Sequence, residues 1–427
     1  MPSATFLNAM PHDTEPHDRH PRLQAVSEDA RVTPIELFFD LVFVFSLTQV
    51  TALMASDLTP MGIVRGLLVL ALLWWCWVGY AWLGNVVQAD EGLGRLTMFA
   101  AMIAMFVMAL TVPEAFEDIP GGLDGPVVLA FAYLAVRLLH LGIFWLAGAH
   151  YDGLRRQLLR FAPSVLGSTA LLLVASQLDG PAQTWTWVLV LIVDYVGTIL
   201  AGASGWQLNS ASHFAERHGL IVIIALGESI VAIGAGVAHL PISWPIIGAS
   251  ALGLALAGTL WWAYFDVVAL VAERVLRRAQ GEVRARLARD SYSYLHLPMI
   301  AGVLLVALGL KKVLEYVGDA SDHTLSDPLA PVPLVAMYAG VSLYLFAHVA
   351  FRWRNVHSVN VQRVVAAIVI LLLIWPASDL PALGALTLLT AATGALIAFE
   401  VWRFGELREQ IRHDESVEVS HLRREPG

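Results

Sequence analysis

Apolar runs of about 20 residues recur along nearly the whole chain, and about 20 residues is the length that a helix needs to cross a bilayer. The composition agrees with this pattern. Of the 427 residues, 57% are hydrophobic and 14% are charged, whereas soluble domains run at about 45–50% and about 25%. We therefore predict an all-α, polytopic integral membrane protein, and the pattern excludes a soluble fold.

The apolar runs divide into about 12 predicted transmembrane helices. The eleventh run is short and ends at Trp375-Pro376, so we expect an atypical span there. The predicted spans are 35–55, 61–83, 94–112, 126–149, 160–177, 183–202, 218–239, 244–266, 291–311, 332–352, 361–375 and 382–402.

The basic residues test this count. With the N-terminus inside, 22 of the 26 arginines and lysines fall in inside segments, among them Arg217 and Arg363. Arg137 alone is left within a span, and the outside segments hold only Arg65, Lys311 and Lys312. Because inside loops carry the excess of basic residues, the partition predicts an even number of spans. It also predicts that both termini lie in the cytoplasm.

Short sequence echoes favour an internal duplication. Leu73–Trp77 in the second span is similar to Leu260–Tyr264 in the eighth, and Met102–Ala104 in the third recurs as Met299–Ala301 in the ninth. Each pair occupies the same place in a six-helix half, which predicts a parallel repeat. The alternative is chance similarity between apolar helices.

This organisation predicts five segments. Residues 1–30 form a polar, disordered cytoplasmic tail, and 31–202 form the first six-helix half. Residues 203–405 form the second half, in which the Arg-rich stretch 267–290 is expected to be a cytoplasmic helix on the anionic leaflet. Residues 406–427 form a second cytoplasmic tail.

Ionisable side chains inside spans are costly, so they usually pair and mark functional paths. Glu36 and Asp40 lie four residues apart on one face of the first span, and Arg137 and His140 lie three apart on one face of the fourth. The first pair is a candidate for a substrate or ion path. The second pair is a candidate for the same role.

Charge balance leaves several arrangements open. One fixed cation, Arg137, faces three acids within spans, Asp40, Asp194 and Glu228. We expect Arg137 to pair with Asp194 or with Glu228. The remaining acids would then be protonated, share His140, or hold a cation.

Glu228 lies near the middle of the seventh span and is either a hydrogen-bonded packing element or a proton or cation site. Gly227 beside it and Gly234 seven residues later would allow a close approach of another helix.

Further candidates lie where spans begin. Glu216 and His218 precede the seventh span and His296 opens the ninth, where it could shuttle a proton or be a satisfied buried histidine. The spacing from His213 through His218 matches no metal-binding signature, and H-E-x-x-H is absent. We expect no metal and no cofactor.

Three segments, Arg31–Phe45, Glu216–Ser229 and Tyr292–Pro298, resemble the bacterial low temperature requirement protein A family. The resemblance extends over roughly residues 30–402. It implies a multi-pass membrane protein of a family named for a cold-growth phenotype, and it brings no catalytic residues with it.

The leading functional hypothesis is a transporter or channel-like protein for a small solute or cation, with the bilayer as its surroundings. Acids and bases occupy different loops, which does not favour a nucleic-acid partner. A membrane scaffold or sensor acting through 267–290 is a second hypothesis. The third is an intramembrane enzyme on lipid-linked substrates, which a cavity beside Arg137 and His140 would favour, although no nucleotide-binding or nucleophile motif is present.

Overall fold

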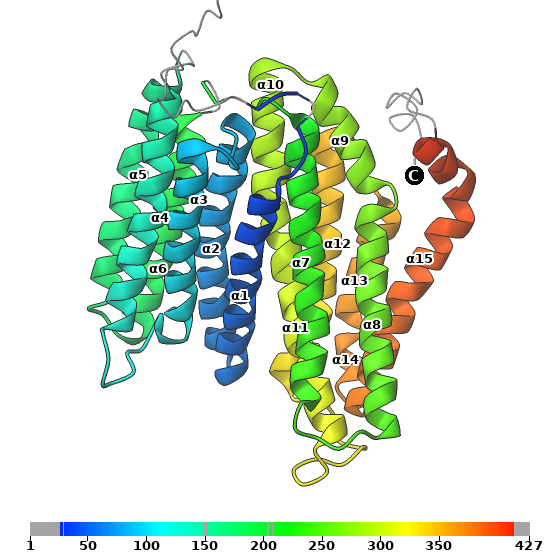
Figure 1. Ribbon diagram of the computed structural model, residues 1–427. Helices are drawn as coiled ribbons and strands as arrows, with labels where there is room; N and C mark the ends of the chain where they lie inside the picture. Colours follow the sequence, from blue (N-terminus) through cyan, green and yellow to red (C-terminus); the bar gives the residue numbers. More distant parts are fainter. Residues whose placement is uncertain (1–25, 29, 149–152, 203–204, 207, 414–427) are drawn as a thin grey trace, which may run out of the picture.

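The computed structural model describes residues 26–28, 30–148, 153–202, 205–206 and 208–413, and in these ranges it consists of helices and short connections (Figure 1). The helices are α1 Pro34–Ser56, α2 Pro60–Val86, α3 Gly92–Leu110, η1 Val112–Glu114, α4 Gly125–Ala147, α5 Leu154–Ala175, α6 Gly180–Ala201, α7 Ala211–Val237, α8 Trp244–Phe265, α9 Val268–Arg278, α10 Gly281–Leu287, η2 Ala288–Tyr294, α11 His296–Gly318, α12 Pro331–Val356, α13 Val361–Leu372, α14 Ile374–Ala377 and α15 Ala382–His413. In the described chain, 11 helical segments are long and apolar enough to cross a membrane, and a shorter one covers Val361–Ala377. The predicted all-α membrane fold is confirmed, with 11 candidate spans in the described chain against about 12 predicted, and the predicted eleventh span corresponds to the shorter segment.

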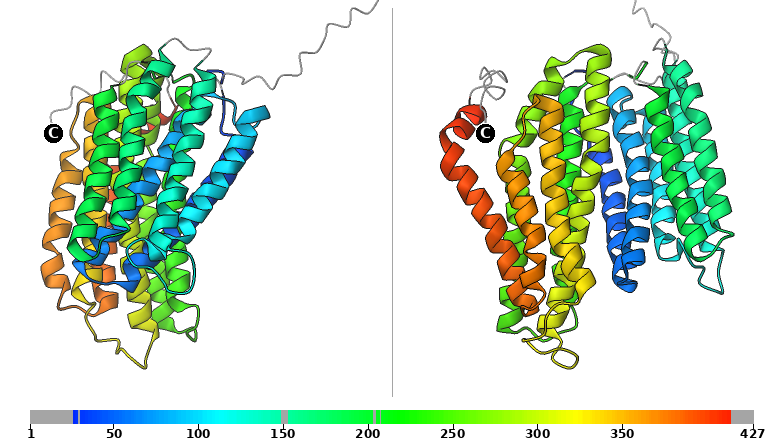
Figure 2. Two further views of the ribbon diagram at one scale, coloured as in Figure 1. Left: turned by 90° about the vertical axis from the view of Figure 1, so that its left-hand side faces the viewer. Right: turned by 180° about the vertical axis from the view of Figure 1, so that it is seen from behind.

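The long helices lie side by side in one bundle (Figures 1 and 2). The chain segment before α1 and the end of α15 both lie at the end of the bundle that carries α10, which we call the α10 end (Figure 1). The chain thus crosses the bundle an even number of times within the described ranges, if α13 and α14 are taken as one crossing.

Two sets of helices, α1–α6 and α7–α15, have a similar order of neighbours. In the first set α1 packs on α2 and α3, α3 on α4, α4 on α5, and α5 on α6. In the second set α7 packs on α8 and α11, α11 on α12, α12 on α13, and α13 on α15. This is the pairing that a parallel repeat predicts, and the division into two six-helix halves remains a prediction.

The helices α2 and α4 begin with N-cap side chains. The side chain of Thr59 accepts from the backbone N–H of Gly62 at 3.0 Å, and that of Asp124 accepts from Val127 at 3.0 Å. Pro60 follows Thr59 at the first helical position, where its missing N–H leaves no hydrogen bond unmade. These local signals explain why α2 and α4 begin where they do.

The tightest helix crossing joins α11 to α12. A Cβ atom added to Gly340 would lie 2.6 Å from the carbonyl oxygen of Gly302, so only glycine permits this approach. By contrast, a Cβ atom added to Gly227 or Gly234 would meet nothing within 4 Å. The expectation that these two glycines admit a neighbouring helix is wrong, because their open sides face away from the bundle's contacts.

The basic stretch 267–290 is not one helix. It forms α9 and α10, separated by a break at which Gly281 has a φ of 52°, a conformation that favours glycine. α9 packs on α7 and α12, and α10 leads through the π-helix η2 into α11.

Two predicted boundaries also change. α7 begins at Ala211, seven residues before the predicted 218, so Arg217 belongs to the helix. α15 continues to His413, so the region predicted as a tail from 406 is helical over its first residues. The predicted tail 1–30 lies almost wholly outside the described ranges.

Candidate functional site

Glu36, Asp40, His213 and Arg217 form a buried group between α1 and α7, which we call the α1–α7 charge cluster. Arg217 donates through Nη1 to Glu36 Oε1 and through Nη2 to Asp40 Oδ1, both at 2.8 Å. His213 Nε2 lies 3.0 Å from Glu36 Oε2, and Trp77 Nε1 donates to Asp40 Oδ1 at 2.8 Å. The four-residue spacing of the two acids allows one guanidinium to hold both.

This cluster overturns the charge balance drawn from the sequence. Arg217 and Arg363 were assigned to inside segments, yet both are buried in helices, with exposed fractions of 0% and 3%. Arg363 donates to both oxygens of Glu400 at 2.8 and 3.0 Å, and Glu400 was missed as a partner. Arg137 is therefore not the single cation within the spans, and most buried acids have a fixed partner.

Glu228 is the exception among the acids. Its Oε2 accepts from Thr48 Oγ1 of α1 at 2.7 Å, and among the described residues it makes no ion pair. The charge of Lys311 on α11 acts on it from a distance. Glu228 thus lies on the same α1–α7 contact as the charge cluster. Its partner Thr48 is eight residues after Asp40 on α1.

Of the other candidates at helix starts, Glu216 lies apart, whereas the rings of His218 and His296 contact each other, with centroids 5.1 Å apart. Glu216 is exposed and its Oε2 accepts from the backbone N–H of Val32 at 3.3 Å. His218 is buried, with Nδ1 2.9 Å from the Phe214 carbonyl and no partner for Nε2 in the described chain. His296 Nε2 lies 2.9 Å from the hydroxyl of Tyr264.

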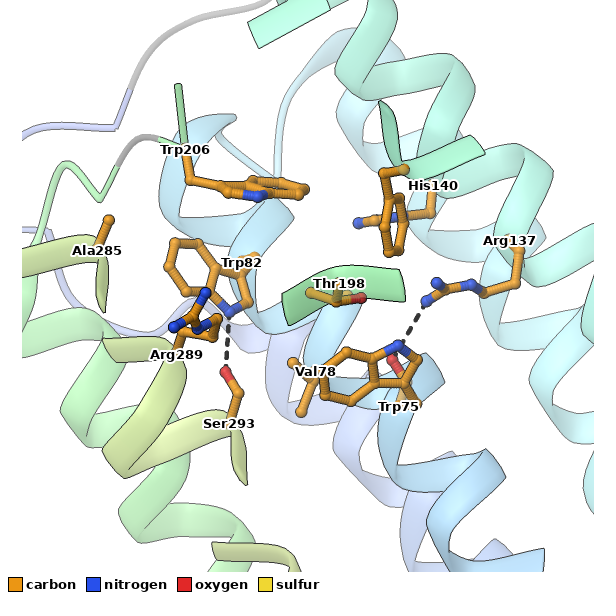
Figure 3. Close-up of a pocket in the computed structure, with 12 residues that line it drawn as sticks. Trp75, Val78, Trp82, Arg137, His140, Thr198, Trp206, Ala285, Arg289 and Ser293 are labelled. Atoms are coloured by element: carbon orange, nitrogen blue, oxygen red, sulfur yellow. Dashed lines mark hydrogen bonds between the residues drawn. The ribbon is translucent and has the colours of Figure 1, made fainter. Parts of the chain in front are cut away.

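A cavity opens beside Arg137 and His140, towards the α10 end (Figure 3). It measures about 480 Å³, part of which is continuous with the outside. α2, α4, α5, α6, the segment before α7, α10 and η2 all contribute to its wall. The lining residues are Trp75, Val78, Gly79, Trp82, Arg137, His140, Phe161, Thr198, Trp206, Ala285, Arg289 and Ser293.

Arg137 is held less firmly than the other two arginines in the spans. Its Nη2 donates to Asp194 Oδ1 at 3.3 Å, its Nη1 donates to the Trp75 carbonyl at 3.4 Å, and its Nε has no partner in the described chain. The other oxygen of Asp194 accepts from the Tyr133 hydroxyl at 2.6 Å. Of the two pairings left open by the sequence, the structure shows Asp194, with the guanidinium also stacked over Phe161 at 4.9 Å.

His140 has two free ring nitrogens in a buried position. Neither nitrogen makes a hydrogen bond of ordinary distance and angle in the described ranges, although the Gly79 backbone acts on the ring and the ring is only 2% exposed. The ring packs against Gly79, where an added Cβ would lie 3.2 Å from Nε2, and edge-on to Phe144. A buried polar group without a partner needs an explanation such as an unseen water or a ligand.

Comparison with known proteins adds the family. The model of the bacterial low temperature requirement A protein matches residues 31–398, nearly the entire chain. The chain belongs to this family. It is similar, at 29% identity over 288 residues, to the Rhizobium meliloti (strain 1021) protein described as "Uncharacterized protein RA0937", covering 64% of this chain and 67% of the relative. No solved structure matches.

In this low temperature requirement A family member, the predicted site residues do not meet at one place. Arg137 and His140 line the cavity, with Asp194 directly behind Arg137. Asp40 and Glu228 lie on the α1–α7 contact and are not among the cavity's lining residues. The aromatic wall could not be predicted from the sequence, because the residues of the wall come from separate helices.

Proposed function

We propose that this protein is a carrier for a small solute, with the cavity beside Arg137 and His140 as its binding site. One observation carries the proposal: inside the bundle, an aromatic-walled space is faced by polar groups that lack protein partners. Pockets of this kind, mostly apolar with a few convergent polar groups, are the usual sites of small ligands. The open part of the cavity supplies a route of entry.

The lining favours a solute over a metal cation. Cation sites in membranes are built from rings of carbonyl or carboxylate oxygens. Here the charged side chains among the described wall residues are Arg137 and Arg289, and these wall residues include no carboxylate. With Glu36, Asp40, Asp194 and Glu400 all paired, Glu228 is the one buried acid among the described residues that is left to support the cation alternative.

The basic residues support an orientation with the α10 end in the cytoplasm of a bacterial plasma membrane. Inside ends of spans carry the excess of Arg and Lys. At the α10 end, the exposed arginines of α9 and α10 are Arg277, Arg278 and Arg286, whereas the opposite end holds only Arg65, Lys311 and Lys312 in the described chain. The cavity would then open on the cytoplasmic side.

The π-helix η2 is suited to link the cavity to movement between the two helix sets. Its Ser293 accepts from Trp74 through the carbonyl at 2.8 Å and from Trp82 through the hydroxyl at 3.0 Å. Its Tyr294 donates to the Tyr195 carbonyl of α6 at 3.0 Å. An element of the second set thus forms part of the wall of a cavity in the first, and relative motion of the sets would alter that wall.

Flux through proteoliposomes tests the proposal. The purified full chain is reconstituted, and uptake of labelled benzoate, benzylamine and glucose is compared with uptake by empty liposomes. We expect at least one solute to enter faster with protein. We also expect Trp206→Ala in the cavity wall to change that uptake, and Trp244→Ala, which alters an exposed tryptophan outside the cavity, to leave it unchanged.

Two results would contradict the carrier. The first is uptake of every solute at the rate of empty liposomes. The second is a potassium, sodium or proton flux that Trp206→Ala leaves intact and Glu228→Gln abolishes, which would establish the cation alternative on the α1–α7 contact.

A second candidate, an intramembrane enzyme acting on lipid-linked substrates, is favoured by the cavity beside His140. A histidine with both ring nitrogens free can serve as a general base. The two candidates differ in outcome: an enzyme changes the mass of a lipid-linked substrate during incubation, and a carrier returns it unchanged. Mass spectrometry of lipid extracts after incubation decides between them.

The scaffold hypothesis has its own test. The exposed arginines Arg277, Arg278 and Arg286 are replaced together by glutamine. A carrier keeps its solute uptake in this variant, because none of the three lines the cavity. If the protein is a scaffold, this variant remains folded but loses the cold-growth phenotype.

A further inference from the structure

We infer that the cavity selects a small organic acid, with its carboxylate at Arg137 and His140 and a flat apolar body between the aromatic walls. This inference deepens the proposed carrier by naming its substrate class. It rests on the proposed function only in that the bound acid is then transported. The preference for an acid is a property of binding alone.

The first step is the hydrogen-bond balance of Arg137. A guanidinium has five N–H donors and recognises carboxylates through two parallel bonds. Arg217 and Arg363 each make two bonds of 3.0 Å or less to carboxylate oxygens. Arg137 makes one bond to a carboxylate oxygen, and it is longer, at 3.3 Å, while the second oxygen of its partner Asp194 is held by Tyr133. Arg137 therefore keeps donors for another anion.

The second step is the position of His140. It lies three residues after Arg137 on α4, so both side chains leave the same helix face and reach the same cavity (Figure 3). A neutral imidazole carries one N–H donor, and in the described protein neither nitrogen of His140 makes a hydrogen bond of ordinary geometry, the Gly79 backbone being its nearest polar neighbour. A carboxylate beside Arg137 can accept from His140 with its second oxygen.

The third step concerns the rest of the wall. Trp82 and Trp206 have ring centroids 5.7 Å apart, and Phe161 and Trp206 have centroids 6.1 Å apart. Flat rings pack well against such surfaces in offset or edge-on arrangements. Since 480 Å³ includes space open to the outside, only a small molecule fits the enclosed part.

The fourth step concerns the charge of the ligand that the cavity wall favours. Arg137 and Arg289 face the cavity, while their acidic partners Asp194 and Asp290 are not lining residues. Each ion pair thus has its basic member, and not its acidic member, in the wall. An organic amine would meet two guanidinium groups without a carboxylate, whereas an organic acid meets no like charge.

Binding to the purified full chain in detergent micelles tests this inference. Isothermal titration calorimetry compares benzoate, its neutral analogue benzamide and the cation benzylamine. We expect benzoate to bind about tenfold more tightly than benzamide, because charge-assisted bonds are the stronger ones, and benzylamine not to bind. Dihexanoyl phosphatidylglycerol, an anionic lipid of short chains, is included to distinguish a free acid from a lipid headgroup.

A matched pair of variants locates the effect. Arg137→Lys keeps a charge for Asp194 but loses the planar fork, so it should weaken benzoate binding about tenfold and leave benzamide binding unchanged. Arg363→Lys makes the same change at a buried arginine that does not line the cavity, and should leave benzoate binding unchanged.

Three outcomes overturn the inference: equal binding of benzamide and benzoate, equal effects of the two lysine variants, or tighter binding of the phosphatidylglycerol than of benzoate. Selective benzoate binding without benzoate uptake by proteoliposomes is a different result. It supports the acid-binding site and refutes the carrier.

Discussion

Replacing Arg217 with methionine tests the account of the α1–α7 charge cluster. The guanidinium holds Glu36 and Asp40 at 2.8 Å each and lies over the Trp77 ring at 5.5 Å. Without it, Glu36 keeps His213 as a partner, but Asp40 keeps only the Trp77 N–H. Breaking a buried ion pair costs about 3–5 kcal/mol, mainly because the remaining charge is left buried without a counter-charge.

We therefore expect Arg217→Met to lower the free energy of unfolding by about 3–5 kcal/mol. Equilibrium unfolding in mixed micelles with increasing dodecyl sulfate, followed by far-ultraviolet circular dichroism, measures this loss. The matched control is Arg286→Met, which removes an exposed pair with Glu282 and should cost about 0–1 kcal/mol.

A second substitution tests the cause of the loss. Adding Asp40→Asn to Arg217→Met removes the stranded charge and keeps an oxygen for the Trp77 N–H. More than half of the lost stability should then return, since the two sites are coupled. The reasoning fails if the double variant is less stable than Arg217→Met, or if Arg217→Met costs no more than Arg286→Met.

Two further predictions concern helix packing and Glu228. Gly340→Ala places a Cβ 2.6 Å from the Gly302 carbonyl and should lower the free energy of unfolding by about 1–3 kcal/mol. Gly258→Ala, in open space, should raise it by up to about 1 kcal/mol. The same unfolding assay measures both variants, and a change of the same sign in both would contradict the close crossing. Glu228→Gln keeps an oxygen for the Thr48 hydroxyl and removes no ion pair, so it should change stability by less than about 0.5 kcal/mol and leave benzoate binding unaltered. A loss above about 2 kcal/mol would show that Glu228 is ionised and paired in the folded protein.

The spans were predictable because the bilayer imposes a length and a composition on every crossing segment. Even the atypical segment Val361–Ala377 was visible, since its apolar run is short and contains Pro376. The place of Arg217 was not visible. Local hydropathy assigns an arginine to the nearest loop, and only the distant carboxylates of Glu36 and Asp40 explain its burial seven residues into α7.

The candidate site was predictable to the extent that it lies on one helix. The spacing of Arg137 and His140 placed both on one face of α4, and both line the cavity. The rest of the wall required the tertiary structure. Trp82, Phe161 and Trp206 come from α2, α5 and the segment before α7, and no periodicity along the chain relates them.

The contrast between Arg137 and two other buried arginines, Arg217 and Arg363, gives the strongest reason to place function at the cavity. Each loses its hydration on burial, and short bonds to carboxylates offset that cost for Arg217 and Arg363. A purely structural Arg137 would gain most from the same arrangement with Asp194. Instead Asp194 accepts its shortest bond from the Tyr133 hydroxyl, at 2.6 Å, and in the described chain Arg137 Nε has no partner and His140 makes no hydrogen bond of ordinary geometry. Departures from full hydrogen bonding persist where they serve function, and a site that binds and releases an anion requires donors that the protein itself does not occupy.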